Sequence, residues 1–169
     1  MSYRLERSLF IPRPRPEVFG FFSDAFNLER VTPSFLHFHI LTPPPIAMRA
    51  GTVIDYELRL YGVKFHWKTR ISAFEPPFYF EDEQEKGPYR HWHHRHDFEE
   101  VPGGTLMRDL VDYALAFEPF GSLAHSLFVR RSVEKIFEYR NQTILEIFGA
   151  KEHRDVDAQN IRAPQNPRK

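Results

Sequence analysis

Residues 122–149 read SLAHSLFVRRSVEKIFEYRNQTILEIFG, and this stretch decides the fold. Its apolar residues recur three or four positions apart, so they fall on one stripe of a helix with about 3.6 residues per turn. The stripe consists of Val129, Val133, Ile136, Phe137, Ile144, Ile147 and Phe148. Ser122 suits the N-cap and Gly149 suits the position after the last turn, which together predict a helix of roughly 40 Å. A stripe of this length needs a large surface to cover it.

One residue, Arg140, interrupts the apolar stripe of this expected helix. An arginine near the edge of a stripe can extend its charged end to water, or it can pair with a carboxylate. Alternatively, this face of the helix lines a cavity and Arg140 points into it. The helix alone favours neither interpretation, so the surface that it packs against decides.

The composition limits the size of the fold and the classes of function. A chain of 169 residues fits one domain with a real core, which we expect over residues 1–150. The 23 basic residues equal the 23 acidic ones, so no net charge attracts nucleic acid or an anionic membrane. The chain has no cysteine, which excludes disulfides, thiolate metal sites and cysteine nucleophiles. The 17 phenylalanines predict an aromatic core or an aromatic-lined pocket.

Neither export nor membrane insertion is expected from the sequence. Met1 leads directly into alternating charged residues, without the apolar run of a signal peptide. No apolar run approaches the length that spans a bilayer, so we expect a cytoplasmic protein. Residues 151–169 are polar and lack periodicity, which predicts a mobile tail.

The order of the other elements predicts a curved antiparallel sheet. A strand over residues 3–11 is followed by prolines and by two short helices, over residues 17–23 and 25–31. A second strand is expected over residues 35–41, before a run of three prolines. After Gly51, segments with a period of two follow, separated by short turns, as antiparallel neighbours require; they cover residues 52–60, 63–74, 78–84, 89–101 and 105–117. The expected fold class is α+β, a sheet of about six or seven strands wrapped around the long C-terminal helix.

Three of these strands carry polar residues on their apolar faces. Trp92 and Phe98 share a face with His94 and His96, so both histidines are expected to point toward the long helix. The same parity turns inward a further set of side chains, Asp82, Gln84, Met107, Asp109 and Tyr113. Arg140 can face this polar band from the helix.

The turns predict how these strands pair. A turn at Pro102-Gly103 places His96 opposite Asp109 and His94 opposite Val111. A turn centred on Pro88 places Asp82 opposite His94. Asp82 and Asp109 are therefore candidate partners for Arg140.

Several local motifs resemble a known superfamily. They are Pro16-Glu17-Val18-Phe19, Asn27-Leu28, Thr32-Pro33, Phe80-x-Asp82-x-Gln84, Gly87-Pro88-Tyr89, Trp92-x-His94-x-His96-x-Phe98, Thr105-x-Met107-x-Asp109 and Ile136-Phe137-x-Tyr139-Arg140. In this order they resemble the helix-grip fold of the SRPBCC (START-like) superfamily over residues 3–149, and within it a bacterial, cyclase/dehydrase-like, ligand-binding branch. The resemblance implies a cavity for a hydrophobic ligand between sheet and helix. Superfamily members transfer lipids, bind hormones or polyketides, or catalyse cyclisation.

Three interpretations of the polar band are open. It can be a self-satisfied network that fixes the sheet register, since buried charges must be paired. It can instead hold the polar group of a mostly apolar ligand. It can also be catalytic, with His94 or His96 oriented by Asp82 or Asp109 as a general acid or base.

The resemblance and the aromatic residues favour binding or carriage of a hydrophobic small molecule, which is lipid-, quinone- or polyketide-like. The alternative is a cyclase/dehydrase-type enzyme with His94, His96 and Asp109 as candidate catalytic residues. The expected ligand contacts are Asp82, Gln84, Trp92, His94, His96, Phe98, Met107, Asp109, Tyr113, Val133, Ile136, Phe137 and Arg140. A module that binds other proteins is neither favoured nor excluded.

Other partners are not expected. His94 and His96 with Asp109 contain the ligand types of a two-histidine, one-carboxylate metal site, but Arg140 would repel a cation. We therefore expect no metal, and no cofactor either. Nucleic-acid binding and stable membrane insertion are not expected, and a homo-oligomer is possible but not indicated.

Overall fold

The structure is a computed structural model that describes residues 2–60, 62–115 and 122–149. The strands are β1 (Ser2–Ile11), β2 (His39–Ile40), β3 (Val53–Leu60), β4 (Val63–Glu75), β5 (Tyr79–Lys86), β6 (Tyr89–Val101) and β7 (Gly104–Leu115). The helices are α1 (Arg15–Phe22), α2 (Asn27–Arg30) and α3 (Ser122–Ile147), with one 3₁₀ turn at Ser34–Leu36. The strands form one antiparallel sheet in the order β1-β7-β6-β5-β4-β3-β2. The α+β helix-grip architecture expected from the sequence is confirmed.

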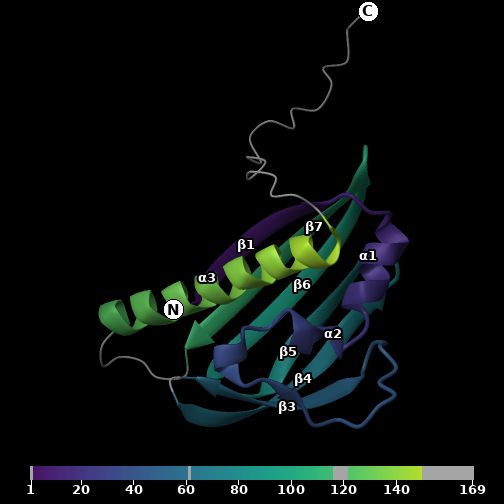
Figure 1. The fold of residues 1–169 in the computed structure, drawn as a ribbon. Coiled ribbons are helices and arrows are strands. Elements are labelled where there is room, and N and C mark those ends of the chain that lie inside the picture. The colour runs from purple at the N-terminus through teal and green to yellow at the C-terminus, as the bar shows by residue number, and fades with distance from the viewer. Residues whose placement is uncertain (1, 61, 116–121, 150–169) are drawn as a thin grey trace, which may run out of the picture.

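Helix α3 crosses one face of this sheet (Figure 1). The middle of its apolar stripe packs near β1 and β7, where Val133 and Phe137 belong to one buried cluster with Leu5 and Val111. The helix ends as expected, because Gly149 has the left-handed backbone (φ 65°) that follows a last helical turn. The cap predicted for the Ser122 side chain and the tail predicted over residues 151–169 lie outside what the structure describes.

Tight turns set the register of the central strands. Pro102 and Gly103 occupy the turn between β6 and β7, and Gly103 has a φ of 86°, which a glycine adopts without strain. Three pairings bring the polar residues together: Asp82 with His94, His94 with Val111, and His96 with Asp109. All three were predicted from the positions of the turns, and all three are confirmed.

The segment that follows α2 differs from the prediction. Instead of a strand over residues 35–41, the chain forms the 3₁₀ turn, a left-handed residue at His37 (φ 43°) and the two-residue strand β2. Pro33 begins the turn, and the three prolines after Thr42 lack the N–H groups that would extend an edge strand. Phe35 is consequently 62 % exposed, and His37 and His39 are also exposed.

The interior is packed unevenly from one end to the other. Near α1 and the C-terminal half of α3, Val18, Met107 and Ile144 are among the residues of a closely packed apolar cluster. A second cluster around Tyr56 and Trp67 faces the other part of α3 and borders open space. The candidate site therefore lies toward β3 and β4, and the packed end holds α3 in position.

Candidate functional site

A cavity of about 190 Å³ lies between the sheet, the α1–β2 region and α3. A cavity of roughly 150 Å³ is already large enough to take a benzene-sized molecule. Strands β3 and β4 form one wall, with Ile54, Tyr56, Leu58, Trp67, Thr69 and Ile71. Most of the lining is aromatic or aliphatic, which is typical of sites that enclose hydrophobic ligands.

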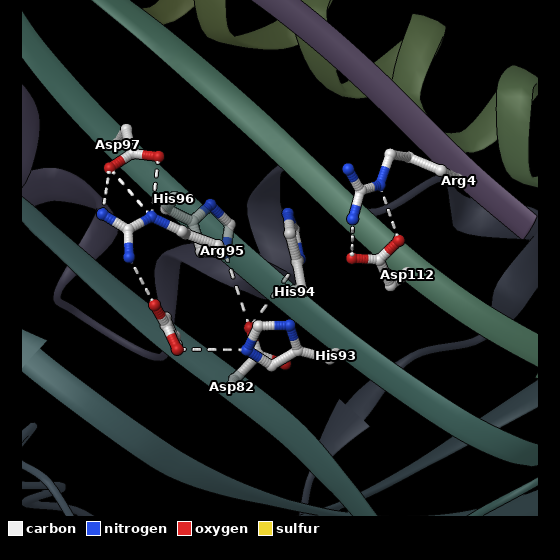
Figure 2. Close-up of polar contacts among 9 residues, drawn as sticks. Arg4, Asp82, His93, His94, Arg95, His96, Asp97 and Asp112 are labelled. Carbon is white, nitrogen blue, oxygen red and sulfur yellow. Dashed lines mark hydrogen bonds and ion pairs between the residues drawn. The ribbon is translucent and has the colours of Figure 1, made fainter.

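Three buried titratable side chains, His94, His96 and Asp109, meet the partly buried Asp82 where β5, β6 and β7 approach this cavity. His94 Nε2 and His96 Nδ1 each lie 2.8 Å from Asp109 Oδ1. The opposite ring nitrogens face Asp82, with His94 Nδ1 at 3.7 Å and His96 Nε2 at 3.5 Å from Asp82 Oδ2. Figure 2 shows both histidines directed toward Asp82. We call Asp82, His94, His96 and Asp109 the polar cluster.

Only one of the two short contacts to Asp109 is a well-directed hydrogen bond. His94 Nε2 hydrogen-bonds to Asp109 Oδ1. His96 Nδ1 is equally close to this oxygen, but it is buried and has no partner in hydrogen-bonding geometry among the described residues. The arrangement therefore leaves one buried ring nitrogen incompletely satisfied, which is uncommon in folded proteins.

Aromatic rings hold the two imidazoles in place. Phe80 stacks on His96 with ring centres 4.3 Å apart, and Phe137 meets His94 edge-on at 5.5 Å. The two imidazoles also contact each other, with ring centres 3.7 Å apart. Because their neighbours are packed, neither ring can turn freely, and both present fixed atoms to the cavity.

The polar cluster separates the pKa values of the two histidines. Burial lowers the pKa of His94, and the charge of His96 lowers it further, against the attraction of Asp109 and Asp82. Burial also acts to lower the pKa of His96, but the two carboxylates outweigh it and the pKa is raised. Near the ordinary histidine pKa of about 6.5, His96 is therefore the protonated ring and His94 the neutral one.

Both carboxyl groups of the polar cluster favour the ionised form. Burial acts to raise the pKa of Asp109, yet the hydrogen bonds and charges of His94 and His96 outweigh it, and the pKa is lowered. The pKa of Asp82 is likewise lowered, because the histidines and Arg140 outweigh burial. Two carboxylates thus share one imidazolium, with the charge of Arg140 nearby.

Arg140 lines the cavity from α3. Its guanidinium carbon lies 5.5 Å from the centre of the Phe137 ring. Among the described residues it forms no ion pair with Asp82 or Asp109, so the salt bridge weighed from the sequence is not made. Its guanidinium therefore remains available to a bound molecule.

The predicted ligand contacts divide into two groups. Those that line the cavity are Asp82, Trp92, His94, His96, Val133, Ile136, Phe137 and Arg140. Those that lie elsewhere in the described structure are Gln84, Phe98, Met107, Asp109 and Tyr113. Strand parity could place these residues on inward faces, but it could not say which inward residues border open space.

The five residues away from the cavity have other surroundings. The Gln84 amide closes the β5–β6 turn, with Nε2 donating to the Tyr89 carbonyl at 2.6 Å. Phe98 and Met107 belong to the packed end of the core. Tyr113 packs against Tyr3, with ring centres 5.5 Å apart. Asp109 lies behind the two histidines, where it orients them without facing the cavity.

Several lining residues were missed by the sequence analysis. Tyr56 and Thr69 contribute a polar spot, since the Tyr56 hydroxyl lies 3.0 Å from Thr69 Oγ1 and Trp67 Nε1 donates to the same oxygen at 3.1 Å. The shared face of Trp67, Thr69 and Ile71 was the signal for this wall. Tyr89 was missed because a bulge at the start of β6 places it on the inner face, against the parity of Trp92.

The fold and the cavity define the class of protein first: a helix-grip domain with a mainly apolar pocket under its long helix. A sequence profile described as "Polyketide cyclase / dehydrase and lipid transport" matches residues 11–138. The chain belongs to this family, and with it to the SRPBCC (START-like) superfamily. Membership supports a ligand-binding or polyketide cyclase-like role. No curated protein matches the chain.

Solved structures agree on the fold. The Zhui aromatase/cyclase from Streptomyces sp. R1128 has a TM-score of 0.69 at 15% identity, covering 95% of this chain and 99% of that chain. Ara h 8.0201 has a TM-score of 0.60 at 16% identity, covering 86% and 99%. A nucleoside-diphosphate sugar epimerase from Corynebacterium glutamicum has a TM-score of 0.61 at 25% identity, covering 84% of this chain and 28% of that chain.

Within the described ranges, no helix is long and apolar enough to span a membrane. The cytoplasmic location expected from the sequence stays a prediction.

Proposed function

We propose that this protein binds or carries a hydrophobic small molecule, which is lipid-, quinone- or polyketide-like, in the cavity under α3. The observation that carries the proposal is the lining itself, in which aromatic and aliphatic side chains surround a small set of polar groups. Such a lining favours an apolar body that bears one or two oxygen atoms. The family description, with its polyketide cyclases and lipid transport proteins, is consistent with this ligand class.

The polar groups on the cavity wall would set the orientation of the ligand. Arg140 can donate to a carbonyl or acidic oxygen, and it makes no ion pair with Asp82 or Asp109 that would have to be broken. Tyr56 stays a neutral phenol, because burial and then the charge of Asp82 raise its pKa. The hydrophobic effect would supply most of the affinity, and these groups the selectivity.

Filling the cavity tests the proposal. Ala25 is buried and lines the cavity, so Ala25→Trp places a large ring in the space that a ligand would take. We expect this variant to lose at least tenfold in affinity for anilinonaphthalene sulfonate, measured by fluorescence titration in chelator-treated buffer. Ala47→Trp is the matched control, because Ala47 is exposed and does not line the cavity.

Native mass spectrometry of protein purified from its own host would identify the ligand. The expected result is a bound small molecule that is present in the Ala47→Trp protein and absent from the Ala25→Trp protein. Equal dye affinity in both variants, with no co-purifying molecule in either, would count against the proposal.

A second candidate function is acid–base catalysis on the bound molecule. The observation that favours it is the pair of buried histidines on the cavity wall, each 2.8 Å from Asp109, with the pKa of His94 lowered and the pKa of His96 raised. Groups whose pKa values are pushed apart in one site can serve as base and acid. His94 would accept a proton from a carbon beside a carbonyl, and His96 would donate a proton to the carbonyl oxygen, which gives the enol.

The two candidate functions are separated by substitution at the polar cluster. If the protein is an enzyme, His94→Gln and His96→Gln should each lower turnover of the identified ligand by 100-fold or more while dye affinity changes little. His91→Gln is the control, because His91 lies exposed on the other face of β6. Full activity in both inward variants would exclude these catalytic roles and leave binding alone.

A further inference from the structure

We propose that Asp82, His94 and His96 form a binding site for one divalent transition-metal ion on the wall of the cavity. Each residue offers one ligand atom, and the three atoms lie within 4.8 Å of one another. From the sequence, the same histidines were weighed as metal ligands with Asp109, and no metal was expected. The structure changes that assessment, because Asp82 takes the place of the third ligand and Asp109 lies behind the histidines.

The spacing of the three ligand atoms suits a metal shell. Asp82 Oδ2 lies 3.7 Å from His94 Nδ1 and 3.5 Å from His96 Nε2. Metal bonds of about 2.0–2.2 Å separate neighbouring ligand atoms by about 2.8–3.6 Å in octahedral and tetrahedral shells. The two separations from Asp82 Oδ2 therefore need to change by at most a few tenths of an ångström, and the two ring nitrogens, which lie within 4.8 Å of each other, would move closer around an ion.

Asp109 prepares both histidines for this role. It lies 2.8 Å from His94 Nε2 and 2.8 Å from His96 Nδ1, the nitrogens that point away from Asp82. A carboxylate that holds the N–H of a ligating imidazole fixes its tautomer and strengthens the metal bond. An ion at Nε2 of His96 would also keep the proton on Nδ1, the buried nitrogen that lacks a well-directed partner.

The charge balance and the surroundings favour a doubly charged ion. Asp82 and Asp109 together carry two negative charges, which a divalent ion neutralises when both imidazoles are neutral. Arg140, the expected obstacle, forms no ion pair with Asp82, and its charge has the smallest effect on that carboxyl among the groups that act on it. All three ligand residues line the cavity, so the remaining coordination positions would face a bound molecule or water.

The ligand set indicates which metals fit. Two imidazoles and one carboxylate with open positions suit Zn²⁺ or Fe²⁺, whereas Mg²⁺ and Ca²⁺ prefer oxygen ligands alone. The inference concerns the ion by itself and does not depend on the proposed organic ligand. Metal binding is therefore tested without that ligand, and dye binding is tested without metal.

Calorimetric titration of tag-free, chelator-stripped protein with Zn²⁺ tests the site. We expect one equivalent to bind, and we expect Asp82→Asn, His94→Gln and His96→Gln each to weaken binding by 100-fold or more. Asp109→Asn should weaken binding by about 10- to 100-fold, as removal of a group behind the ligands usually does. His93→Gln is the matched control, because His93 pairs with Glu81 outside the cavity (Figure 2), and it should bind as the wild type does.

A measurement on the unchanged protein guards against variants that do not fold. Zn²⁺ should shift the ¹⁵N resonances of His94 Nδ1 and His96 Nε2 and leave those of His91 and His93 in place. Absence of binding at millimolar Zn²⁺ would overturn the proposal. It would equally be overturned if the outward histidines shifted instead, or if His93→Gln lost affinity while Asp82→Asn kept it.

Discussion

His94 and His96 are identical side chains two positions apart on one strand, yet their surroundings move their pKa values in opposite directions. The cause is local: for His96 the nearby Asp109 and Asp82 outweigh the effect of burial, whereas for His94 burial and the charge of His96 outweigh the attraction of the same two carboxylates. The sequence could predict that both rings point inward. It could not predict their unlike charge, which depends on distances of a few tenths of an ångström between atoms that no pattern specifies.

Asp109 makes the acid stability of the metal-free protein predictable. Its pKa in the folded protein is lowered, so Asp109 adds to the free energy of unfolding above the ordinary aspartate pKa of about 3.9. This contribution is lost as the pH falls through the pKa that Asp109 has in the folded protein. His94 acts in the same direction from about pH 6.5 downward, because its folded-state pKa is lowered too. We expect Asp109→Asn to cost about 3 kcal/mol at pH 7 and to flatten the loss of stability between pH 5 and the acid limit.

Urea denaturation in chelator-containing buffer over this pH range measures both effects. Asp112→Asn is a control at an exposed ion pair with Arg4, where a loss below about 1 kcal/mol is expected. An Asp109→Asn variant with the same pH slope as the wild type would show that the carboxylate is not held ionised by the histidines.

Arg140 should discriminate ligands by charge. Its guanidinium lines the cavity without an ion pair to the polar cluster, so an acidic oxygen on a ligand would gain a charge-assisted hydrogen bond there. We expect Arg140→Gln to weaken anilinonaphthalene sulfonate, which is anionic, by about tenfold, equivalent to about 1.4 kcal/mol. Affinity for the neutral dye Nile red should change less than twofold.

The same helix provides a control for that comparison. Arg130 is exposed and pairs with Glu134, so Arg130→Gln should leave both dyes unaffected. Fluorescence titration of the two dyes against the two variants gives the four affinities. Equal weakening of both dyes by Arg140→Gln would mean that Arg140 shapes the cavity and does not recognise charge.

At the scale of elements, strand parity and the residues at the turns supplied most of what the sequence could predict about the sheet. The prediction for residues 89–101 succeeded because Pro102-Gly103 fixes one end and the alternation is long. It failed at Tyr89, where a bulge reverses the face, because a bulge leaves no clear mark in a sequence. The predicted strand over residues 35–41 failed because alternation in so short a segment is weak evidence beside flanking prolines.

Two glycines, one after the last turn of α3 and one within α1, predict opposite effects of an alanine substitution. Gly149 has a φ of 65°, so Gly149→Ala forces a side chain into the left-handed region and should cost about 1 kcal/mol. Gly20 lies in α1 with an ordinary helical backbone, and an added Cβ would meet nothing within 4 Å. Gly20→Ala should therefore stabilise the protein by about 0.5–1 kcal/mol.

Thermal and urea unfolding of the two alanine variants give the sign of each effect. Opposite signs are the expected outcome. A neutral or stabilising Gly149→Ala would mean that the end of α3 relaxes into another conformation and does not depend on the left-handed residue.

At the scale of the whole molecule, one end of the fold is a packed core and the other contains the cavity. The sequence indicated aromatic abundance but not its distribution, because the same residue types, such as Phe98 and Phe137, serve the packed cluster and the cavity wall alike. Which inward side chains meet a partner depends on the distance between α3 and each strand. That distance is a property of the assembled fold, so the cavity could be expected only through the resemblance to a superfamily.

Because the interior is packed unevenly, shortening a buried aliphatic side chain to alanine should lower the free energy of unfolding by different amounts at the two ends. Ile144 is fully buried in the packed cluster, so Ile144→Ala leaves a new void and should destabilise the protein by about 3–5 kcal/mol. Leu58 is buried but borders space that already exists, so Leu58→Ala breaks fewer contacts and should cost about 1–2 kcal/mol. Urea denaturation measures both changes, provided that the m-value is the same in the two variants. The Leu58→Ala protein should in addition bind larger dyes. If both deletions cost the same, the β3–β4 end is as closely packed as the other, and α3 covers a core there and not a pocket.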